Sequence, residues 1–585
     1  RFDAAMTLAK QHFQRLWFPL PGGGAGVPSR AEHSMSSEDF ERLFPLEFWR
    51  EVVDRVAAEV PDTLLLAEAF WLMESYFVRT LGMHRVYNSA FMHMMKHEDN
   101  AKFRQLLKKT LAFNPEILKR FVNFMNNPDE ATAVEQFGKG DKYFGVAVLL
   151  ATLPGLPMFG HGQVEGFREK YGMEYRRAYL QEDIDRGFVE HHEKMIFPLL
   201  HRRFLFSGAR YFELYDFISN GQVVEDVLAY SNRCGGQRAL VVYHNRPLQT
   251  GGWVKNTCPR GEEGAMQDGK PLSRALDLQV GENIFYRFRD HCSDVHYLRS
   301  SHELAEQGLF VTLGPYQAHV FLDFTAVTDT DGCWRQLWQK LGGQPVADLD
   351  REYRRLFHAG VLQALNQVLK AGADFFRLGD GGCARVVRIY GEFLQILQRD
   401  LHLGGDIELL TDCLQQQLQT VKRLEEEIAG GMREIIWPWL VLLSLERLSH
   451  GGAEPVPVAD WLDRYPFEEV LMGRWPEDMA AENMQLLRLL LRHRTCGCLD
   501  REHWLKRLFD DNDVRAFLLV HRYQDCNWFS RERFERLVNG LMTTAVLEKQ
   551  DSAKQWFERC RHKIVLILAR AEQTGYRLDK FLTLV

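Results

Sequence analysis

The chain has 585 residues, of which 46% are apolar, so it can bury more than one sizeable core. Its 72 basic and 79 acidic residues leave a formal net charge of -7, a mild imbalance that disfavours a nucleic-acid partner. The longest apolar run covers only eleven residues, 435–445, and contains Pro438, whereas a membrane-spanning helix needs roughly 20 residues. We therefore expect a buried helix there, no membrane span and no nucleic-acid surface.

The cysteines and the first residue bear on cellular location. All ten cysteines lie at or beyond Cys234, and they are scattered apart from Cys496 and Cys498. Scatter of this kind is typical of reduced thiols and predicts a cytoplasmic protein. A metal site at the Cys-x-Cys pair is disfavoured, because no second pair or nearby histidine completes a ligand set. The chain begins with Arg1 in the middle of a pattern, so we expect a piece of a longer protein, and a signal peptide ahead of it stays open.

Residues 1 to about 205 alternate short apolar runs with segments of helical periodicity, such as 38–60. Strands and helices in alternation are typical of parallel β/α units. The glycine-rich stretch 19–30 is expected to be a flexible loop rather than a phosphate site, because no Gly-Lys-Ser/Thr follows it. The runs expected to be strands are 63–70, 85–91, 120–125 and 153–160.

Residues from about 206 to 326 carry short runs rich in Val, Tyr and Phe, separated by Gly, Pro and Asn. This pattern predicts an antiparallel β-sandwich. The expected strands lie within 211–217, 227–232, 238–245, 308–313 and 317–324.

Residues from about 330 to 585 show helical periodicity throughout. One predicted apolar face consists of Leu410, Leu414, Leu418, Val421, Leu424 and Ile428. The chain is therefore predicted to combine an α/β region (1–205), an all-β region (206–326) and an all-α region (330–585) whose role the sequence does not indicate.

Three acids, Asp3, Glu68 and Asp129, each lie at the carboxyl end of a predicted strand. Glu68 and Asp129 are 61 residues apart, which matches two units of a (β/α)8 barrel at about 31 residues each. The run 85–91 supplies the strand between them. Since the carboxyl ends of barrel strands converge at one mouth, where the catalytic groups of such barrels lie, we expect the three acids to meet there.

The surroundings of these acids differ. Arg1 is two residues from Asp3, so both side chains share one face of a strand, and the guanidinium would keep Asp3 ionised. Glu68 ends the apolar run "LLLAEAF" and is expected to stay protonated as a general acid. One ionised and one protonated carboxyl are what a retaining glycosidase uses. The plainer alternatives are an ordinary salt bridge at Asp3 and a chance Ala-Glu-Ala at Glu68.

In this order, Arg-x-Asp, a Glu that closes an apolar strand and Asn-x-Asp resemble the signature of the α-amylase superfamily, glycoside hydrolase family thirteen. The resemblance covers about residues 1–325 and includes 149–166, 195–214 and 308–322, which look like the last barrel strand with its loop, the final barrel helix and the closing hairpin of the sandwich. It implies a TIM barrel, present from the end of strand four onward, followed by a β-sandwich.

The resemblance also implies roles for single residues. Asp3 is the expected nucleophile with Arg1 as its partner, Glu68 is the acid/base, and Asp129 binds sugar hydroxyls. Asn127 belongs to the same motif and is expected to contact substrate.

Aromatic residues near these motifs are expected to stack on sugars, with core packing as the alternative for each. They are Phe70, Trp71 and Tyr87. Met6, Thr7 and Pro128 stand where the family often has Lys, His and His, which leaves substrate and acceptor open.

The sequence thus predicts a retaining hydrolase of α-linked glucans or maltooligosaccharides. The alternatives are an α-glucan transglycosylase, phosphate-using transferase or maltosyltransferase of the same fold, and a non-catalytic glucan-binding protein. The resemblance allows a bound calcium ion, no other cofactor is expected, and the oligomeric state is not indicated. Because Arg1 falls at the end of the fourth barrel strand, the chain as given is expected to be an inactive half-barrel with a sandwich and a helical tail.

Overall fold

The structure is a computed structural model that describes residues 5–23, 28–69, 76–170, 176–262, 265–378, 382–424, 428, 430–448, 458–493, 504–548 and 553–584. The chain divides into two compact units, Arg1–Leu349 and Asp350–Val585, which are described separately. Among the described residues, no helix has the length and apolarity to cross a bilayer.

A four-stranded parallel sheet forms the first part of unit Arg1–Leu349. Its strands are adjacent in chain order, and each pairs in parallel with the next. They are β1 (Leu66–Ala67), β2 (Arg85–Tyr87), β3 (Phe121–Phe124) and β4 (Leu156–Met158). The predicted parallel β/α arrangement is therefore confirmed for these four strands.

Helices precede, separate and follow the four strands. They are α1 (Lys10–Trp17), α2 (Pro28–Ala31), α3 (Ser37–Leu43), α4 (Phe48–Glu59), α5 (Ser89–His97), α6 (Asn100–Phe113), α7 (Ala133–Phe137), α8 (Asp141–Thr152), α9 (Arg186–Met195), α10 (Phe197–His201) and α11 (Arg203–Phe206), with the 3-10 turns η1 (Ala5–Leu8) and η3 (Pro115–Arg120) and the π turn η2 (Tyr76–Thr80).

Several element boundaries differ from prediction. Among the described residues, the strands expected over 63–70 and 153–160 cover only Leu66–Ala67 and Leu156–Met158. The helix expected over 38–60 is split into α3 and α4, because Pro45 lacks an N–H and disfavours helical backbone in the residue before it. The strand expected over 85–91 ends at Tyr87, and α5 begins at Ser89. Beyond Tyr87, Asn88 continues the pairing with β3: its backbone N–H donates to the Val122 carbonyl at 2.9 Å.

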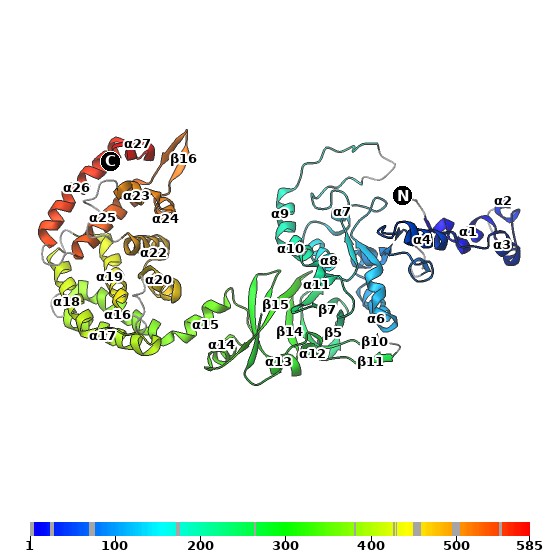
Figure 1. Cartoon of the computed structure of the whole chain (residues 1–585), viewed down its shortest axis with the longest axis horizontal. Coiled ribbons are helices and arrows are strands. Elements are labelled where there is room, and N and C mark those ends of the chain that lie inside the picture. The colour runs from blue at the N-terminus through cyan, green and yellow to red at the C-terminus, as the bar shows by residue number, and fades with distance from the viewer. Residues whose placement is uncertain are drawn as a thin grey trace. The chain divides into compact units, whose positions relative to one another are not determined.

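An antiparallel sheet follows (Figure 1). Its order is β13-β12-β15-β8-β7-β5-β9-β14, with β6 paired to β5. The strands are β5 (Glu213–Ser219), β6 (Gln222–Val223), β7 (Val227–Cys234), β8 (Gln237–His244), β9 (Thr250–Thr257), β12 (Ile284–Asp290), β13 (Val295–Ser300), β14 (Leu309–Leu313) and β15 (Ala318–Thr328), and a separate hairpin consists of β10 (Arg260–Glu262) and β11 (Ala265–Gln267).

Two strands of this sheet change partner along their length. β15 pairs with β8 through Ala318–Phe321 and with β12 from Phe321 onward, and β5 passes from β7 to β9. The sheet packs around its own core, which includes Tyr215 and Phe288. The antiparallel strands expected from the sequence are thus present, and they form one continuous ladder. Three helices complete this part: α12 (Leu272–Ala275), α13 (Ser301–Glu306) and α14 (Cys333–Leu341).

The parallel and antiparallel parts share a second core, in which α8 and α11 pack against β7 and β8 (Figure 1). At Gly145 of α8, a Cβ atom would lie 2.0 Å from the ring of Tyr243 in β8, so only glycine allows this approach. The division predicted near residue 205 stays a prediction, because this core extends across it.

Arg104 of α6 joins the two parts through a fully buried guanidinium. It donates to the carbonyls of Tyr215 and Val227 at 3.2 and 3.0 Å. It also pairs with Asp216 and, at 2.7 Å, with Glu225. The charge is therefore compensated on the side of the antiparallel sheet, as burial of an ion requires.

Glu98, directly after α5, is a second connection. It accepts hydrogen bonds from Lys142 at 2.7 Å, Tyr316 at 2.8 Å and Arg246 at 2.9 Å. Burial alone would raise the pKa of Glu98, but the hydrogen bonds from Lys142 and Tyr316 and the charge of Lys142 hold the pKa below its ordinary value. The carboxylate is thus favoured in the folded state.

This lowered pKa predicts how stability depends on pH. A carboxyl whose folded pKa lies below its unfolded value stabilises the fold above the unfolded pKa and loses that contribution as pH falls through the folded pKa. Glu98→Gln should lower the free energy of unfolding by about 1–2 kcal/mol near neutral pH. The difference in unfolding free energy between the variant and the wild type should narrow as pH falls toward about 4. Urea titrations of both proteins at each pH measure this difference. A difference that does not change with pH would contradict the role of the ionised carboxylate.

In its described segments, the unit Asp350–Val585 is helical apart from the hairpin β16 (His521–Tyr523) and β17 (Cys526–Trp528). Its helices are α15 (Leu349–Phe357), α16 (Ala359–Leu378), α17 (Gly382–Leu401), α18 (Ile407–Arg423), α19 (Gly430–Ser444), α20 (Val458–Arg464), α21 (Phe467–Met472), α22 (Glu477–Arg492), α23 (Trp504–Asp510), α24 (Asn512–Phe517), α25 (Arg531–Leu547), α26 (Ala553–Gln573) and α27 (Leu578–Leu584), with the 3-10 turn η5 (Leu445–Arg447).

Two predictions for this unit are confirmed. The six residues of the predicted apolar face are all buried, and four of them lie in α18, which ends at Arg423 before Leu424 and Ile428. The run 435–445 lies almost wholly in α19, and its Trp439 is fully buried. The unit has its own core, which also contains Trp461 and Phe534.

Candidate active site

The carboxyl ends of β1, β2 and β3 lie at one edge of the parallel sheet, because parallel strands run in one direction. Ala67 pairs with Val86, and Tyr87 pairs with Val122. Glu68 follows β1 directly, and Asn127 and Asp129 follow β3. The sequence-predicted residues at 68, 87, 127 and 129 therefore come to the same edge.

Burial alternates along the segment that carries Glu68. Ala67 and Ala69 are buried, in a cluster that includes Trp49 and Val53 of α4. Leu66, by contrast, is 38% exposed, and Leu64 is exposed as well. Successive side chains of an extended strand point to opposite faces. Glu68, which is half-buried, therefore takes the face of Leu66, away from the α4 cluster.

The predicted apolar run is buried on one face only. Leu64 and Leu66 are exposed, whereas Ala67 and Ala69 are buried in a cluster against which Leu65 also packs. Glu68 itself is half-buried. Its predicted protonated state stays a prediction.

Asp129 lies in an exposed turn after β3 that Asn127 shapes. The buried Asn127 Oδ1 accepts the backbone N–H of Asp129 at 3.0 Å and of Glu130 at 2.9 Å. This is the local hydrogen bonding by which Asn favours turns. Lys170 reaches the same turn and donates to the Asp129 carbonyl at 2.7 Å. Asn127 thus positions Asp129, and its expected contact with substrate stays a prediction.

Tyr87 is half-buried at the end of β2. Its ring meets the ring of Phe124 edge-on, with centroids 5.7 Å apart. Continuing the register of β1 and β2 places Glu68 beside Tyr87, on the face that also holds Val122. The contact of Tyr87 with Phe124 matches the core-packing alternative. Sugar stacking by Tyr87 stays a prediction.

Four predicted site residues lie outside the described residues: Arg1, Asp3, Phe70 and Trp71. Their roles stay predictions. Within the described ranges, no group of three or more His, Cys, Asp or Glu side chains could hold a metal ion. The calcium ion that the resemblance allows stays a prediction.

The sequence did not predict a buried hydrogen-bond network that includes the loop after β4. Gln163 Oε1 accepts the Gly160 N–H at 3.0 Å, and the Tyr143 hydroxyl donates to the Gln163 carbonyl at 3.1 Å. The Tyr143 oxygen also lies 3.0 Å from His192 Nε2. Burial raises the pKa of Tyr143 and lowers the pKa of His192, so both groups are favoured as neutral hydrogen-bonding partners.

Asn126 is a second residue that the sequence reasoning missed. It is 5% exposed, and its Oδ1 meets no hydrogen-bond donor among the described residues. A Cβ at Gly160 would lie 2.4 Å from the Asn126 amide, so the absence of a side chain at Gly160 makes room for it. The glycines of "GHGQVEG" were the available signal for this packing.

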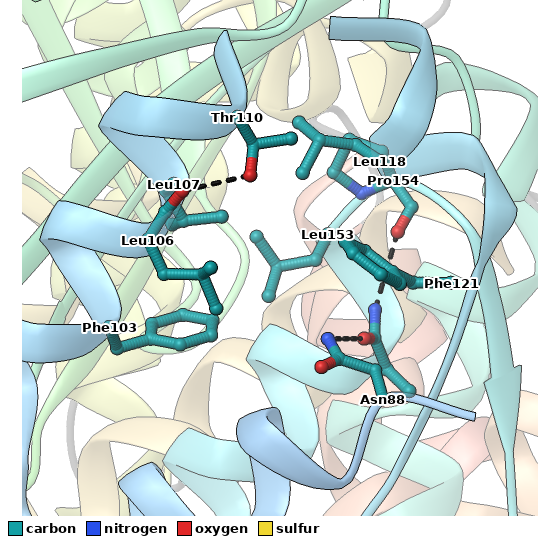
Figure 2. Close-up of a pocket in the computed structure, with 10 residues that line it drawn as sticks. Asn88, Phe103, Leu106, Leu107, Thr110, Leu118, Phe121, Leu153 and Pro154 are labelled. Carbon is teal, nitrogen blue, oxygen red and sulfur yellow. Dashed lines mark hydrogen bonds between the residues drawn. The ribbon is translucent and has the colours of Figure 1, made fainter. Parts of the chain in front are cut away.

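A pair of buried amides ties β2 to β3 on the other face of the sheet. Asn88 Nδ2 donates to Asn123 Oδ1 at 2.8 Å, and Asn123 Nδ2 donates to the Pro154 carbonyl at 3.3 Å (Figure 2). The adjoining cavity, lined also by Phe103 and Leu107 of α6, has a volume of about 20 Å³. That is room for about one water molecule, so this cavity belongs to the structure rather than to substrate binding.

Comparison with known proteins gives weak likenesses. No protein-family profile and no curated protein sequence matches the chain. An α-amylase from Anoxybacillus is 12% identical, with 52% of this chain and 58% of that chain covered and a TM-score of 0.34. A debranching enzyme from Nostoc punctiforme is 15% identical, with 47% and 53% covered and a TM-score of 0.32.

An α-amylase from H. orenii is 16% identical, with 50% of this chain and 59% of that chain covered and a TM-score of 0.31. The chain thus spans somewhat more than half the length of these solved structures. At such TM-scores the function has to be argued from the residues of this chain.

Proposed function

We propose that residues 1 to about 205 are the carboxyl-terminal part of a (β/α)8 barrel that hydrolyses α-linked glucans with retention of configuration. Residues 206–326 would be its β-sandwich, and residues 330–585 a helical appendage. The observation that supports the proposal most is the common edge of one parallel sheet shared by Glu68 and the Asn127–Asp129 turn. In barrels of parallel strands this edge carries the chemistry.

In the proposed reaction, the Asp3 carboxylate attacks the anomeric carbon. The glycosidic C–O bond breaks, and Glu68 gives its proton to the departing oxygen. Glu68 then takes a proton from water, which attacks the glycosyl–Asp3 ester and frees Asp3. Asp129, held by Asn127, would accept hydrogen bonds from hydroxyls of the sugar at the cleavage site.

Covalent trapping tests the nucleophile. A slow fluorinated α-maltosyl substrate should label Asp3 of the full-length protein. Fluorine beside the anomeric carbon slows both steps, and a good leaving group restores the rate of the first step only, so the glycosyl–Asp3 ester accumulates. Mass spectrometry of proteolytic peptides locates the label. A label on Asp129 would reverse the assignment of the two acids, and no label despite turnover would reject the covalent intermediate.

Product analysis separates hydrolysis from transfer. Incubation of the full-length protein with maltoheptaose should give shorter maltooligosaccharides whether or not phosphate is present. Longer oligosaccharides would identify the transglycosylase alternative, and maltosyl phosphate would identify a phosphate-using transferase. Glucan binding without any turnover would favour the non-catalytic alternative.

A further inference from the structure

The helical unit Asp350–Val585 contains an open cleft of about 560 Å³. This volume falls within the range of about 300–1,000 Å³ that is usual for small-molecule sites. Its lining residues come from α15, α20, α21 and α22 and from the connection between α20 and α21. The lining residues are Arg351, Arg354, Leu462, Asp463, Tyr465, Pro466, Glu468, Glu469, Met472 and Arg488.

The charges of the cleft balance one another. Three arginines and three carboxylates line it, and most of them are fixed in ion pairs. Arg488 donates to Asp463 at 2.8 Å and to Glu468 at 3.1 Å. Glu469 accepts from Arg351 and from Arg355, the latter at 2.8 Å. These paired groups therefore offer an ionic ligand little net attraction, and they present fixed donors and acceptors to a neutral one.

Two groups of the lining keep hydrogen-bonding capacity. Among the described residues, the Tyr465 hydroxyl meets no hydrogen-bond partner and Arg354 meets no carboxylate. Arg354 uses its Nε for the Asp350 carbonyl, at a long 3.4 Å. The Tyr465 ring is held in place by Trp461 and His358, with ring centroids at 5.3 and 5.1 Å. A rigid aromatic ring thus lies beside unused donors.

The remaining lining is apolar and comes from Leu462, Pro466 and Met472. An aromatic ring and apolar groups suit the C–H faces of a pyranose, and charged groups in fixed pairs suit its hydroxyls. We propose that this cleft is a second binding site for a neutral oligosaccharide, separate from the barrel. The choice of an α-glucan as its ligand rests on the proposed function.

Arginine footprinting tests the site in the full-length protein. The protein carries Glu68→Gln, so that the glucan is not consumed, and phenylglyoxal labels accessible arginines for mass spectrometry. Maltoheptaose at about ten times its Kd should slow labelling of Arg354 about tenfold. Arg561, an exposed arginine on α26, is the matched control and should label at an unchanged rate. Tyr465→Phe, which removes only the hydroxyl, should weaken the protection of Arg354.

The outcomes separate the two proposals. Protection of Arg354 by inorganic phosphate but not by maltoheptaose would show an anion site and overturn the inference. Equal labelling with and without maltoheptaose, or equal protection of Arg561, would also overturn it. Protection of Arg354 in the Glu68→Gln protein, together with no turnover by the wild type, would support the cleft while the proposed barrel chemistry fails. Turnover that depends on Glu68, without protection of Arg354, would reject the cleft alone.

Discussion

Glu68→Gln should lower kcat on maltoheptaose by about 10²–10⁴-fold in the full-length protein, which is the usual worth of general acid–base catalysis. The amide has nearly the same shape as the carboxyl, but it cannot give a proton to the departing sugar oxygen. Since the half-buried Glu68 lies on the strand face opposite the buried Ala67 and Ala69, the substitution should leave the fold intact. Initial rates of reducing-end release measure the effect.

Leaving-group dependence distinguishes a lost proton donor from a damaged site. Glu68→Gln should cleave α-maltosyl fluoride much better than maltoheptaose relative to the wild type, because fluoride departs with little protonation. Glu59→Gln, at an exposed position of α4, is the matched control and should keep full activity. If Glu68→Gln stays within a few-fold of the wild type on maltoheptaose, Glu68 has no part in the mechanism.

The largest effect on stability is expected from Arg104→Ala. It would remove the buried guanidinium and leave the carbonyls of Tyr215 and Val227 without these donors. Breaking a buried ion pair costs roughly 3–5 kcal/mol. Because the Asp216 and Glu225 side chains are 33% and 49% exposed and can rehydrate, we expect about 3 kcal/mol, the lower end.

Hydrogen exchange with mass spectrometry measures this loss locally. Peptides from α6, β5 and β7 of Arg104→Ala should exchange about 100-fold faster, which corresponds to about 3 kcal/mol. The matched control is Lys102→Ala on the same helix, whose side chain is 69% exposed and paired only with Asp99. That variant should change exchange within about 0.5 kcal/mol. Equal protection in Arg104→Ala and wild type would show that the ion pairs contribute nothing net.

Much of the fold could be predicted from apolar runs, because the buried strands and the buried face of α18 consist of apolar residues. The residues at which the elements begin and end were harder to predict. Pro45 was a readable signal for the break between α3 and α4. At β1 the apolar run does not reveal which side chains are buried: Ala67 and Ala69 lie in the cluster with α4, against which Leu65 also packs, whereas Leu64 and Leu66 are exposed.

The candidate site was predictable where its residues follow strand ends in a recognisable order. The buried hydrogen bonds around the site were not predictable, because they join residues far apart in the chain. Tyr143 meets Gln163 and His192, which lie 20 and 49 residues away. No local pattern marks such a network. The Asn126 Oδ1, which meets no donor among the described residues, likewise could not be recognised before the pairing of β3 with β4 was known.

The core shared by α8, α11, β7 and β8 has a practical consequence for dissecting the protein. A cut near residue 205 follows the change in sequence texture, but it passes through one continuous packed interior. Each piece expressed alone would expose the apolar surface that the other piece covers. Arg104 would also be separated from Asp216 and Glu225, the carboxylates with which it pairs. The smallest piece that we expect to express as a well-behaved protein therefore carries both parts, up to the boundary near Leu349.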